Sequence, residues 1–169
     1  MTQVVRCGGN ERSLPTGGRR VRAAEVARAE RSLTRGLAGW SIASIVVGGV
    51  MAVVGHRGRI PALFVFGRHT AGWGVIDGII AGAGALVARR RGALDDERAA
   101  AHARQLRTTL LVNAAADLGY IAVGTRIVNG RADSRQRLRP GDGWAMVLQG
   151  AFLFVFDVVH ARRFARIIR

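Results

Sequence analysis

The sequence predicts an all-α protein, a four-helix transmembrane bundle with both termini in the cytoplasm and a cytoplasmic N-terminal helix. Four apolar stretches have about the 20 residues needed to cross a hydrocarbon core of ~30 Å, and each carries at most one charged residue. Arg residues bracket all four stretches. None of them has the stripe of Glu, Lys and Arg that faces water in a soluble helical bundle.

These stretches define the expected membrane spans. The first contains no charged residue, and the second stops at three consecutive Arg residues. The expected spans are residues 36–56, 69–88, 108–125 and 143–161. Together they form one unit, a bundle over residues 35–161, because no linker rich in Ser, Pro or Gly divides the chain.

Polar segments precede, connect and follow the spans. Residues 1–34 are expected to form an Arg-rich cytoplasmic tail, and residues 21–35 lack Pro and Gly, which favours a juxtamembrane helix against the inner leaflet. Residues 162–169 are expected to form a basic cytoplasmic tail. Residues 61–67 are apolar and begin with Pro, which fits either an interfacial helix or an early start of the second span. Residues 126–142 contain Asn-Gly and Pro-Gly turn signals and are expected to form an outer loop.

The distribution of Arg sets the expected orientation. Residues 1–35 carry eight Arg, the connection between the second and third spans six and the C-terminal tail four, whereas the other two connections carry three and five. Cytoplasmic segments carry the excess of positive charge, so the termini are expected inside. Trp40, Trp73 and Trp144 lie near span ends and are expected to be interface anchors. The basic segments are expected to attract anionic lipid headgroups. Nucleic acid is not an expected partner, because long uncharged stretches separate the charges.

Helical spacing gives each span a small or polar face. In the second span Gly74, Gly78 and Gly82 recur every four residues on the same side as Asp77. This spacing allows close approach of a neighbouring helix in lipid. Gly48 lies on a similar face of the first span. We expect these four glycines to pack helices together.

Polar residues on these faces predict a polar centre inside the bundle. Asp77 and Asp117 each lie about nine residues, roughly 13 Å, from the outer edge of their spans, so they can face each other near the midplane. Ionisable residues within spans normally turn inward and find partners. The candidate residues are Asp77, Asn113, Asp117, Tyr120, Gln149, Asp157 and His160.

The sequence leaves two interpretations of this centre open. The preferred one is a set of interhelical hydrogen bonds that hold the bundle together. The other is a proton or cation site, because no span contains Lys or Arg to pair with the acids. Two close carboxylates in a low dielectric would not both stay ionised, so we expect at least one of Asp77 and Asp117 to be protonated near neutral pH.

Motifs for catalysis are not found in the sequence. There is no GxxxxGK phosphate loop, no His-Glu metal motif, and no Ser or Cys nucleophile beside a base. Cys7 is the only cysteine and is expected to be an unpaired thiol. We therefore expect no enzymatic activity, no cofactor and no metal site.

Three span sequences, GWGVIDGIIAG, NAAADLGYIAVG and LQGAFLFVFDVVH, carry a resemblance to a known family. Over about residues 33–164 the chain resembles a family of small bacterial four-helix membrane proteins classed as a domain of unknown function. The resemblance implies four spans and supplies no activity, substrate or cofactor. The family's recurrent polar positions would then be Asp77, Asn113, Asp117, Tyr120, Gln149 and Asp157.

The expected function is that of a non-catalytic protein of the bacterial plasma membrane with a scaffold, assembly or envelope-support role. A homo-oligomer or a membrane-protein partner fits this expectation. The alternative is a small oligomeric transporter or channel subunit that uses Asp77 and Asp117 as a proton or cation site. Four short spans are too few for a roomy pathway, so this alternative requires an oligomer.

Overall fold

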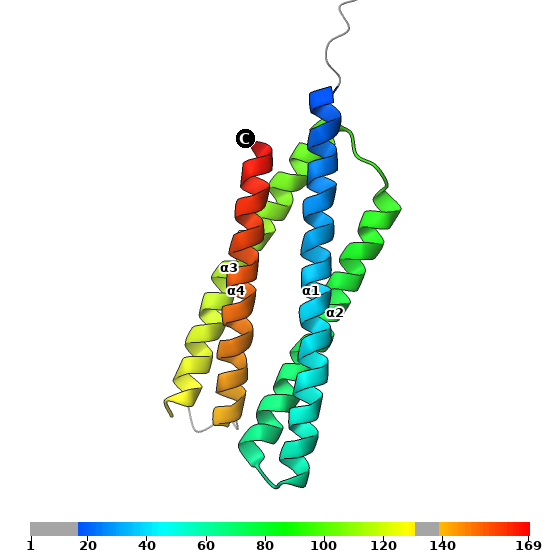
Figure 1. Ribbon diagram of the computed structural model, residues 1–169. Coiled ribbons are helices and arrows are strands. Elements are labelled where there is room, and N and C mark those ends of the chain that lie inside the picture. Colours follow the sequence, from blue (N-terminus) through cyan, green and yellow to red (C-terminus); the bar gives the residue numbers. More distant parts are fainter. Residues whose placement is uncertain (1–16, 131–138) are drawn as a thin grey trace, which may run out of the picture.

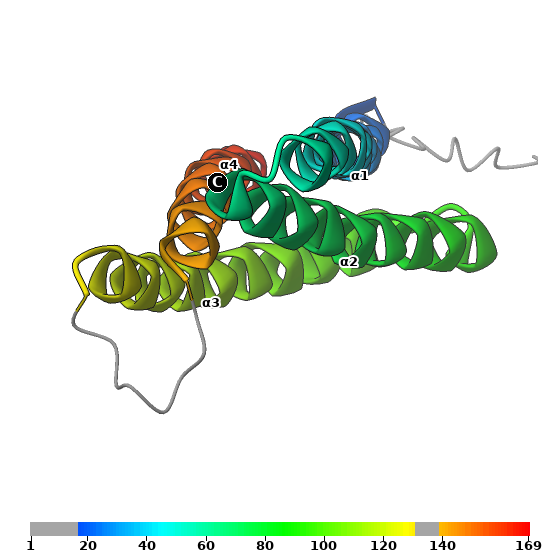
Figure 2. The same ribbon diagram turned by 90° about the horizontal axis from the view of Figure 1, so that it is seen from below.

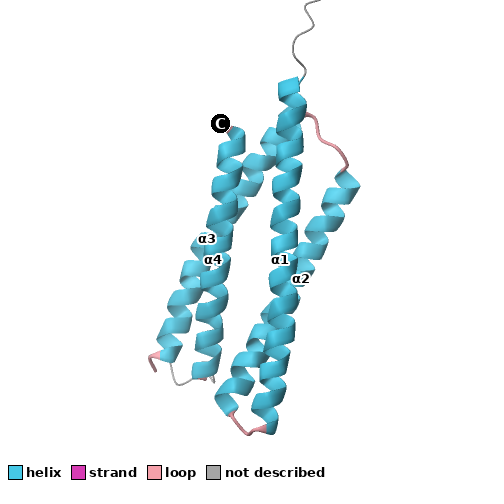
Figure 3. Cartoon of the chain, in the orientation of Figure 1, coloured by secondary structure: helices cyan, strands magenta, loops and turns pink. Residues whose placement is uncertain are grey.

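The computed structural model describes residues 17–130 and 139–169. Residues 1–16 of the expected N-terminal tail, which include Cys7, and residues 131–138 of the expected outer loop lie outside this part. The all-α prediction is confirmed: the chain folds into four helices, each long and apolar enough to cross a membrane (Figures 1 and 3). In chain order they are α1 (Gly17–Arg57), α2 (Pro61–Arg91), α3 (Asp96–Val128) and α4 (Pro140–Ile168).

Local sequence signals explain where these helices begin and end. Pro61 and Pro140 occupy the first turns of α2 and α4, where the missing N–H of proline costs no helical hydrogen bond. At the start of α3 the Asp95 carboxylate accepts a hydrogen bond from the Arg98 amide at 2.8 Å. Gly92 ends α2 with a φ of +71°, a conformation that glycine adopts without steric cost.

The helices form two hairpins, α1 with α2 and α3 with α4, which lie side by side (Figures 1 and 2). Glycines bring the backbones close in both. A Cβ added to Gly48 of α1 would lie 2.6 Å from the Ala71 amide nitrogen of α2. In the second hairpin, a Cβ added to Gly124 would lie 2.8 Å from the Gly143 carbonyl oxygen. Such approach is the packing that small residues permit in lipid.

One end of the bundle differs from the sequence expectation. The segment expected to be a separate helix along the inner leaflet is instead the first part of α1, which continues without a break into the first expected span. It belongs to the bundle because its buried Val26 and Ala29 pack against α3 and α4. The expected basic tail is likewise mostly helical, since α4 continues to Ile168 and buries Phe164 completely. The buried members of this cluster are Val26, Ala29, Ala99, Ala103, Leu110, Ala161 and Phe164.

The beginning of α2 decides between the two structures expected for residues 61–67, and its course keeps its backbone away from that of α3. Residues 61–67 are the first two turns of α2, so they start this helix early and do not form a separate one. Although α2 and α3 are consecutive, none of their described Cα atoms lie within 8 Å of each other. The backbone of the half of α2 that leads to Arg91 therefore packs against α1, and its end meets α3 through the Arg91 side chain, whose Nη1 lies 2.7 Å from Nε2 of His102.

Candidate functional site

The inward face of α2 follows the expected spacing. Gly74, Asp77 and Ala81 are buried, whereas Ile76 and Ile79 on the other faces are exposed. Gly74 lies against α1, where an added Cβ would be 2.9 Å from the Ser41 carbonyl oxygen. Because the small residues of α2 face α1, the Asp77 carboxylate on the same side is buried in the bundle at a level where α1 and α2 are in contact.

Gln149 of α4 connects three helices at this depth. Its side chain is 2 % exposed, and its Nε2 donates to Oδ2 of Asp77 on α2 at 2.6 Å. Its Oε1 accepts from Nε1 of Trp40 on α1 at 3.3 Å. Trp40 also stacks on Phe152 with a centroid separation of 3.6 Å, so this tryptophan faces the bundle. We call Trp40, Asp77 and Gln149 the central link.

Two further carboxyl groups lie near the central link. Asp157 of α4 is buried, and Asp117 of α3 is half-buried with an Oδ2 atom that has no hydrogen-bond partner among the described residues. Both groups lie close enough to Asp77 for negative charges on them to repel. A buried oxygen without a partner costs free energy. These carboxyl groups can therefore accept a proton or a cation. Alternatively, two neighbouring carboxyl groups can share one proton.

A second polar network lies nearer the beginning of α4. His69 of α2 contacts Oδ1 of Asp142 through Nδ1 at 3.2 Å and the Tyr120 hydroxyl through Nε2 at 2.9 Å. Trp73 donates from Nε1 to the same Nε2 at 3.1 Å. The other oxygen of Asp142 accepts from the Arg139 amide at 3.0 Å, so this carboxylate also caps α4.

These contacts assign the proton of His69. An indole N–H can only donate, so Nε2 of His69 must accept, and the proton of the neutral ring lies on Nδ1. Nδ1–H then donates to the carboxylate of Asp142. We call His69, Trp73, Tyr120 and Asp142 the outer network; it joins α2, α3 and α4.

The sequence-derived candidates therefore separate into groups. Asp77 and Gln149 belong to the central link, Asp117 and Asp157 lie beside it, and Tyr120 belongs to the outer network. The remaining two candidates lie apart from both. Asn113 is exposed on α3, and His160 donates from Nδ1 to the Phe156 carbonyl of its own helix at 2.8 Å.

The four candidate packing glycines also differ in their surroundings. Gly48 and Gly74 lie against backbone of the neighbouring helix, and a Cβ added to Gly78 would lie 2.6 Å from the Ser41 hydroxyl. Gly82 packs no helix, because an added Cβ would meet nothing within 4 Å. The reason is the course of α2, whose second half lies away from α3.

Sequence reasoning missed His69, Asp142 and the inward roles of two tryptophans. His69 and Asp142 stand at the beginnings of the second and fourth spans, and their shared depth was the available signal. Trp40 and Trp73 were expected to be interface anchors, but their N–H groups donate to Gln149 and His69 within the bundle. Trp144, in contrast, is exposed.

Among residues 17–130 and 139–169, no group of three or more His, Cys, Asp or Glu side chains is placed to hold a metal ion. No curated protein and no solved structure matches the chain. A family model does match, and its matched region, residues 36–158, contains the central link and the outer network. The chain therefore belongs to DUF6992, a family of unknown function.

Proposed function

We propose that this chain is a non-catalytic, multi-pass protein of the bacterial plasma membrane, whose bundle has a scaffold, assembly or envelope-support role. The observation that carries the proposal is the apolar exterior of all four helices. Ile42, Ile79, Val112 and Val155 are 63 %, 66 %, 62 % and 59 % exposed. Apolar patches of this extent are unusual on soluble monomers, whereas lipid accommodates them without cost.

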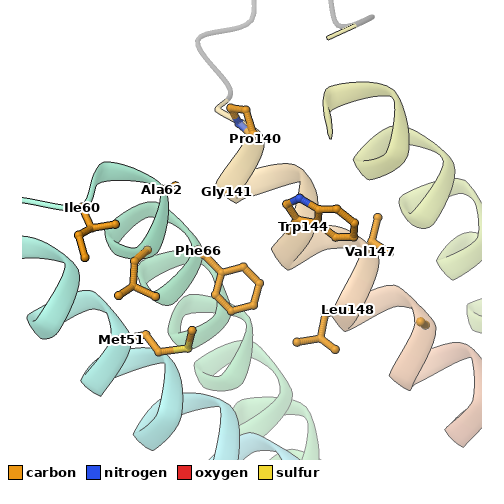
Figure 4. A pocket seen from close by; sticks show the side chains of 11 residues that line it. Met51, Ile60, Ala62, Phe66, Pro140, Gly141, Trp144, Val147 and Leu148 are labelled. Atoms are coloured by element: carbon orange, nitrogen blue, oxygen red, sulfur yellow. The ribbon is translucent and has the colours of Figure 1, made fainter. Parts of the chain in front are cut away.

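An apolar groove between the two hairpins also supports a membrane location. A cavity of about 840 Å³ lies between the first turns of α2, the end of α1 and the beginning of α4 (Figure 4). Phe66 and Trp144 flank it, with Met51 and Leu148 deeper along the groove (Figure 4). Water in an apolar groove of this size would lack hydrogen-bond partners, whereas an acyl chain would fill it.

The orientation proposed for the bundle has both termini in the cytoplasm. It is supported by the positions of Arg relative to the helix ends. Arg89, Arg90 and Arg91 end α2 on the side where α1 begins and α4 ends, and the excess of Arg on that side is typical of the cytoplasm.

The scaffold role is supported by the way the buried polar groups are used. Asp77 accepts from Gln149, which accepts from Trp40, so the hydrogen bonds connect the two hairpins to each other. Hydrogen bonds of this kind add about 0.6 kcal/mol each on average between helices in membranes. They fix which faces of the hairpins meet, and this is a structural use of the polar centre.

Two features support a second copy of the chain, or another membrane protein, as a partner. Gly82 and Gly84 of α2 present backbone that no described residue covers, and Asn113 of α3 is a polar residue on an exposed surface. A helix packed against either surface would use these groups. The test is the mass of the detergent-solubilised protein. Gly82→Leu should reduce assembly, whereas Gly119→Leu, at another open glycine, should leave it unchanged.

A proton or cation site is the second candidate function, and the Asp117 carboxyl group favours it. Its buried Oδ2 has no hydrogen-bond partner in the part of the chain that the structure describes, and the neighbouring Asp77 and Asp157 are also acidic. On this alternative an oligomer of the chain would move protons or cations along the acidic groups.

Flux in proteoliposomes separates the two functions. Purified chain is reconstituted with a pH-sensitive dye inside the vesicles, and a pH or potassium gradient is imposed. The scaffold proposal predicts the same decay of the gradient as in empty vesicles. A faster decay that Asp117→Asn abolishes and Asn113→Asp leaves intact would replace the scaffold proposal by the transport function.

A further inference from the structure

A pocket of about 380 Å³ lies between α1 and α2 at the end of the bundle where α1 begins. Its polar lining comprises Glu30, Arg31, Thr34 and Arg35 of α1 and Arg89 and Arg91 of α2. Three alanines and Gly92 form the remaining wall. The pocket thus combines four guanidinium groups with one carboxylate, at the level where the first expected span begins and the second ends.

The single carboxylate of this pocket is already occupied by partners. Oε2 of Glu30 accepts from Nη2 of Arg91 at 2.5 Å, and Oε1 lies 3.2 Å from Nε2 of His102 on α3. Nη1 of Arg91 lies 2.7 Å from the same His102 nitrogen. These contacts join α1, α2 and α3, and they hold Arg91 in the wall of the pocket.

The other three guanidinium groups have no such partner. Arg31, Arg35 and Arg89 are exposed, and in the described part of the chain no carboxylate lies within 4.0 Å of their nitrogens. Like charges gathered around one cavity repel, and an anion between them would relieve this repulsion. The hydroxyl of Thr34 adds a donor to the same lining.

We propose that this pocket binds a phosphate group, and that the phosphate is the headgroup of an anionic phospholipid in the cytoplasmic leaflet. The inference rests on the proposed membrane location. Guanidinium groups bind phosphate oxygens through paired, charge-assisted hydrogen bonds. Basic pockets between transmembrane helices on the cytoplasmic side are suited to anionic headgroups.

The surroundings of the pocket favour a lipid over free phosphate. Ala85 and Ala88 of α2 line the pocket, and the exposed Leu86 and Val87 lie on the same turn of the helix. A phosphate held by Arg35 and Arg89 therefore lies beside apolar surface along which acyl chains can extend. Soluble phosphate makes no use of that surface.

The test compares lipid retention by the full chain and two double variants. Each protein is purified in a neutral detergent and titrated with phosphatidylglycerol or phosphatidylcholine, and bound lipid is counted by native mass spectrometry. Arg31→Gln/Arg89→Gln removes two guanidinium groups from the pocket. Arg162→Gln/Arg163→Gln is the matched control, because it removes two exposed guanidinium groups from α4 at the same end of the bundle.

The wild-type chain and the control should prefer phosphatidylglycerol, and the pocket variant should bind it roughly 30-fold more weakly, as expected for two Arg near an anionic headgroup. Equal retention by the pocket variant and the control would overturn the site. Equal binding of both lipids, together with saturable binding of inorganic phosphate, would overturn the lipid as the source. Alkaline extraction of membranes is run in parallel. Extraction of the wild-type chain would contradict the membrane location, whereas failure of the headgroup site alone leaves every variant in the membrane.

Discussion

Replacing Gly48 by Ala should push α1 and α2 apart at a point where their backbones lie close together. The added Cβ would lie 2.6 Å from the Ala71 amide nitrogen and 2.7 Å from the Gly67 carbonyl oxygen. Both atoms belong to the backbone of α2, so no side chain can rotate away. Ordinary contact begins at 3.4 Å, so the helices must separate locally by about 0.8 Å.

The cost of this separation follows from the behaviour of overpacked cores. Extra methyl groups in a well-packed interior typically cost about 1–3 kcal/mol. Gly49→Ala is the matched control, because an added Cβ there meets nothing within 4 Å. Alanine favours the helix over glycine by up to about 1 kcal/mol at both positions, so the difference between the variants isolates the cost of packing.

Reversible unfolding in mixed micelles by added SDS, followed by tryptophan fluorescence, measures this difference. We expect Gly48→Ala to have a free energy of unfolding about 1–3 kcal/mol below that of Gly49→Ala, which is a change of roughly 5- to 150-fold in the unfolding constant. If the two variants were equally stable, the close backbone contact between α1 and α2 would be wrong.

Three other substitutions test separate parts of the fold in the same unfolding assay. Phe164→Ala should cost about 3–5 kcal/mol because the ring is fully buried, and a loss below 1 kcal/mol would contradict a packed cluster at this end of the bundle. Tyr120→Phe should cost about 0.5–1.5 kcal/mol through loss of the hydroxyl contact with His69; no change would show that the outer network is unimportant for stability. Gln149→Leu should lower the free energy of unfolding by about 1–3 kcal/mol. The loss should be much smaller in an Asp77→Leu background, because the carboxylate that accepts from Gln149 is then already absent. Additive costs would argue against the hydrogen bond between them.

Several parts of the fold could be predicted from the sequence because the period of a helix determines its faces. The spacing of Gly74, Asp77 and Ala81 predicted the inward face of α2, and the intervening isoleucines are indeed exposed. The length of the apolar stretches predicted four helices for a different reason, because a helix that crosses lipid satisfies its own backbone hydrogen bonds.

Contacts between helices could not be predicted in the same way. His69 and Asp142 are 73 residues apart, and periodicity shows which side of a helix faces inward without showing which residue it meets. Gly82 shares the face of Gly78 but packs no helix, because its surroundings depend on the angle between α2 and its neighbours. A local pattern contains no information on that angle.

The many Arg residues near the ends of the helices made the buried apolar residues there difficult to predict. The Arg residues of the last segment suggested a solvated tail, although Phe164 within it is buried beside Val26 and Ala103. Single apolar residues among many Arg give a weak periodic signal. The first part of α1 was likewise expected to be a separate helix along the inner leaflet, because sequence alone does not show that α3 and α4 offer it an apolar surface.

The sides of the membrane on which the connections lie decide whether the four helices span the bilayer with both termini in the cytoplasm. In a background with Cys7→Ser, single cysteines are introduced by Asn129→Cys, at the end of α3, and by Ala93→Cys, in the connection between α2 and α3. Cells whose plasma membrane is intact, and whose outer layers let the reagent reach it, are then treated with a membrane-impermeant maleimide. We expect labelling of Asn129→Cys in intact cells and of Ala93→Cys only after the membrane is opened. Labelling of both, or of Ala93→Cys alone, in intact cells would contradict a four-span bundle with its termini in the cytoplasm.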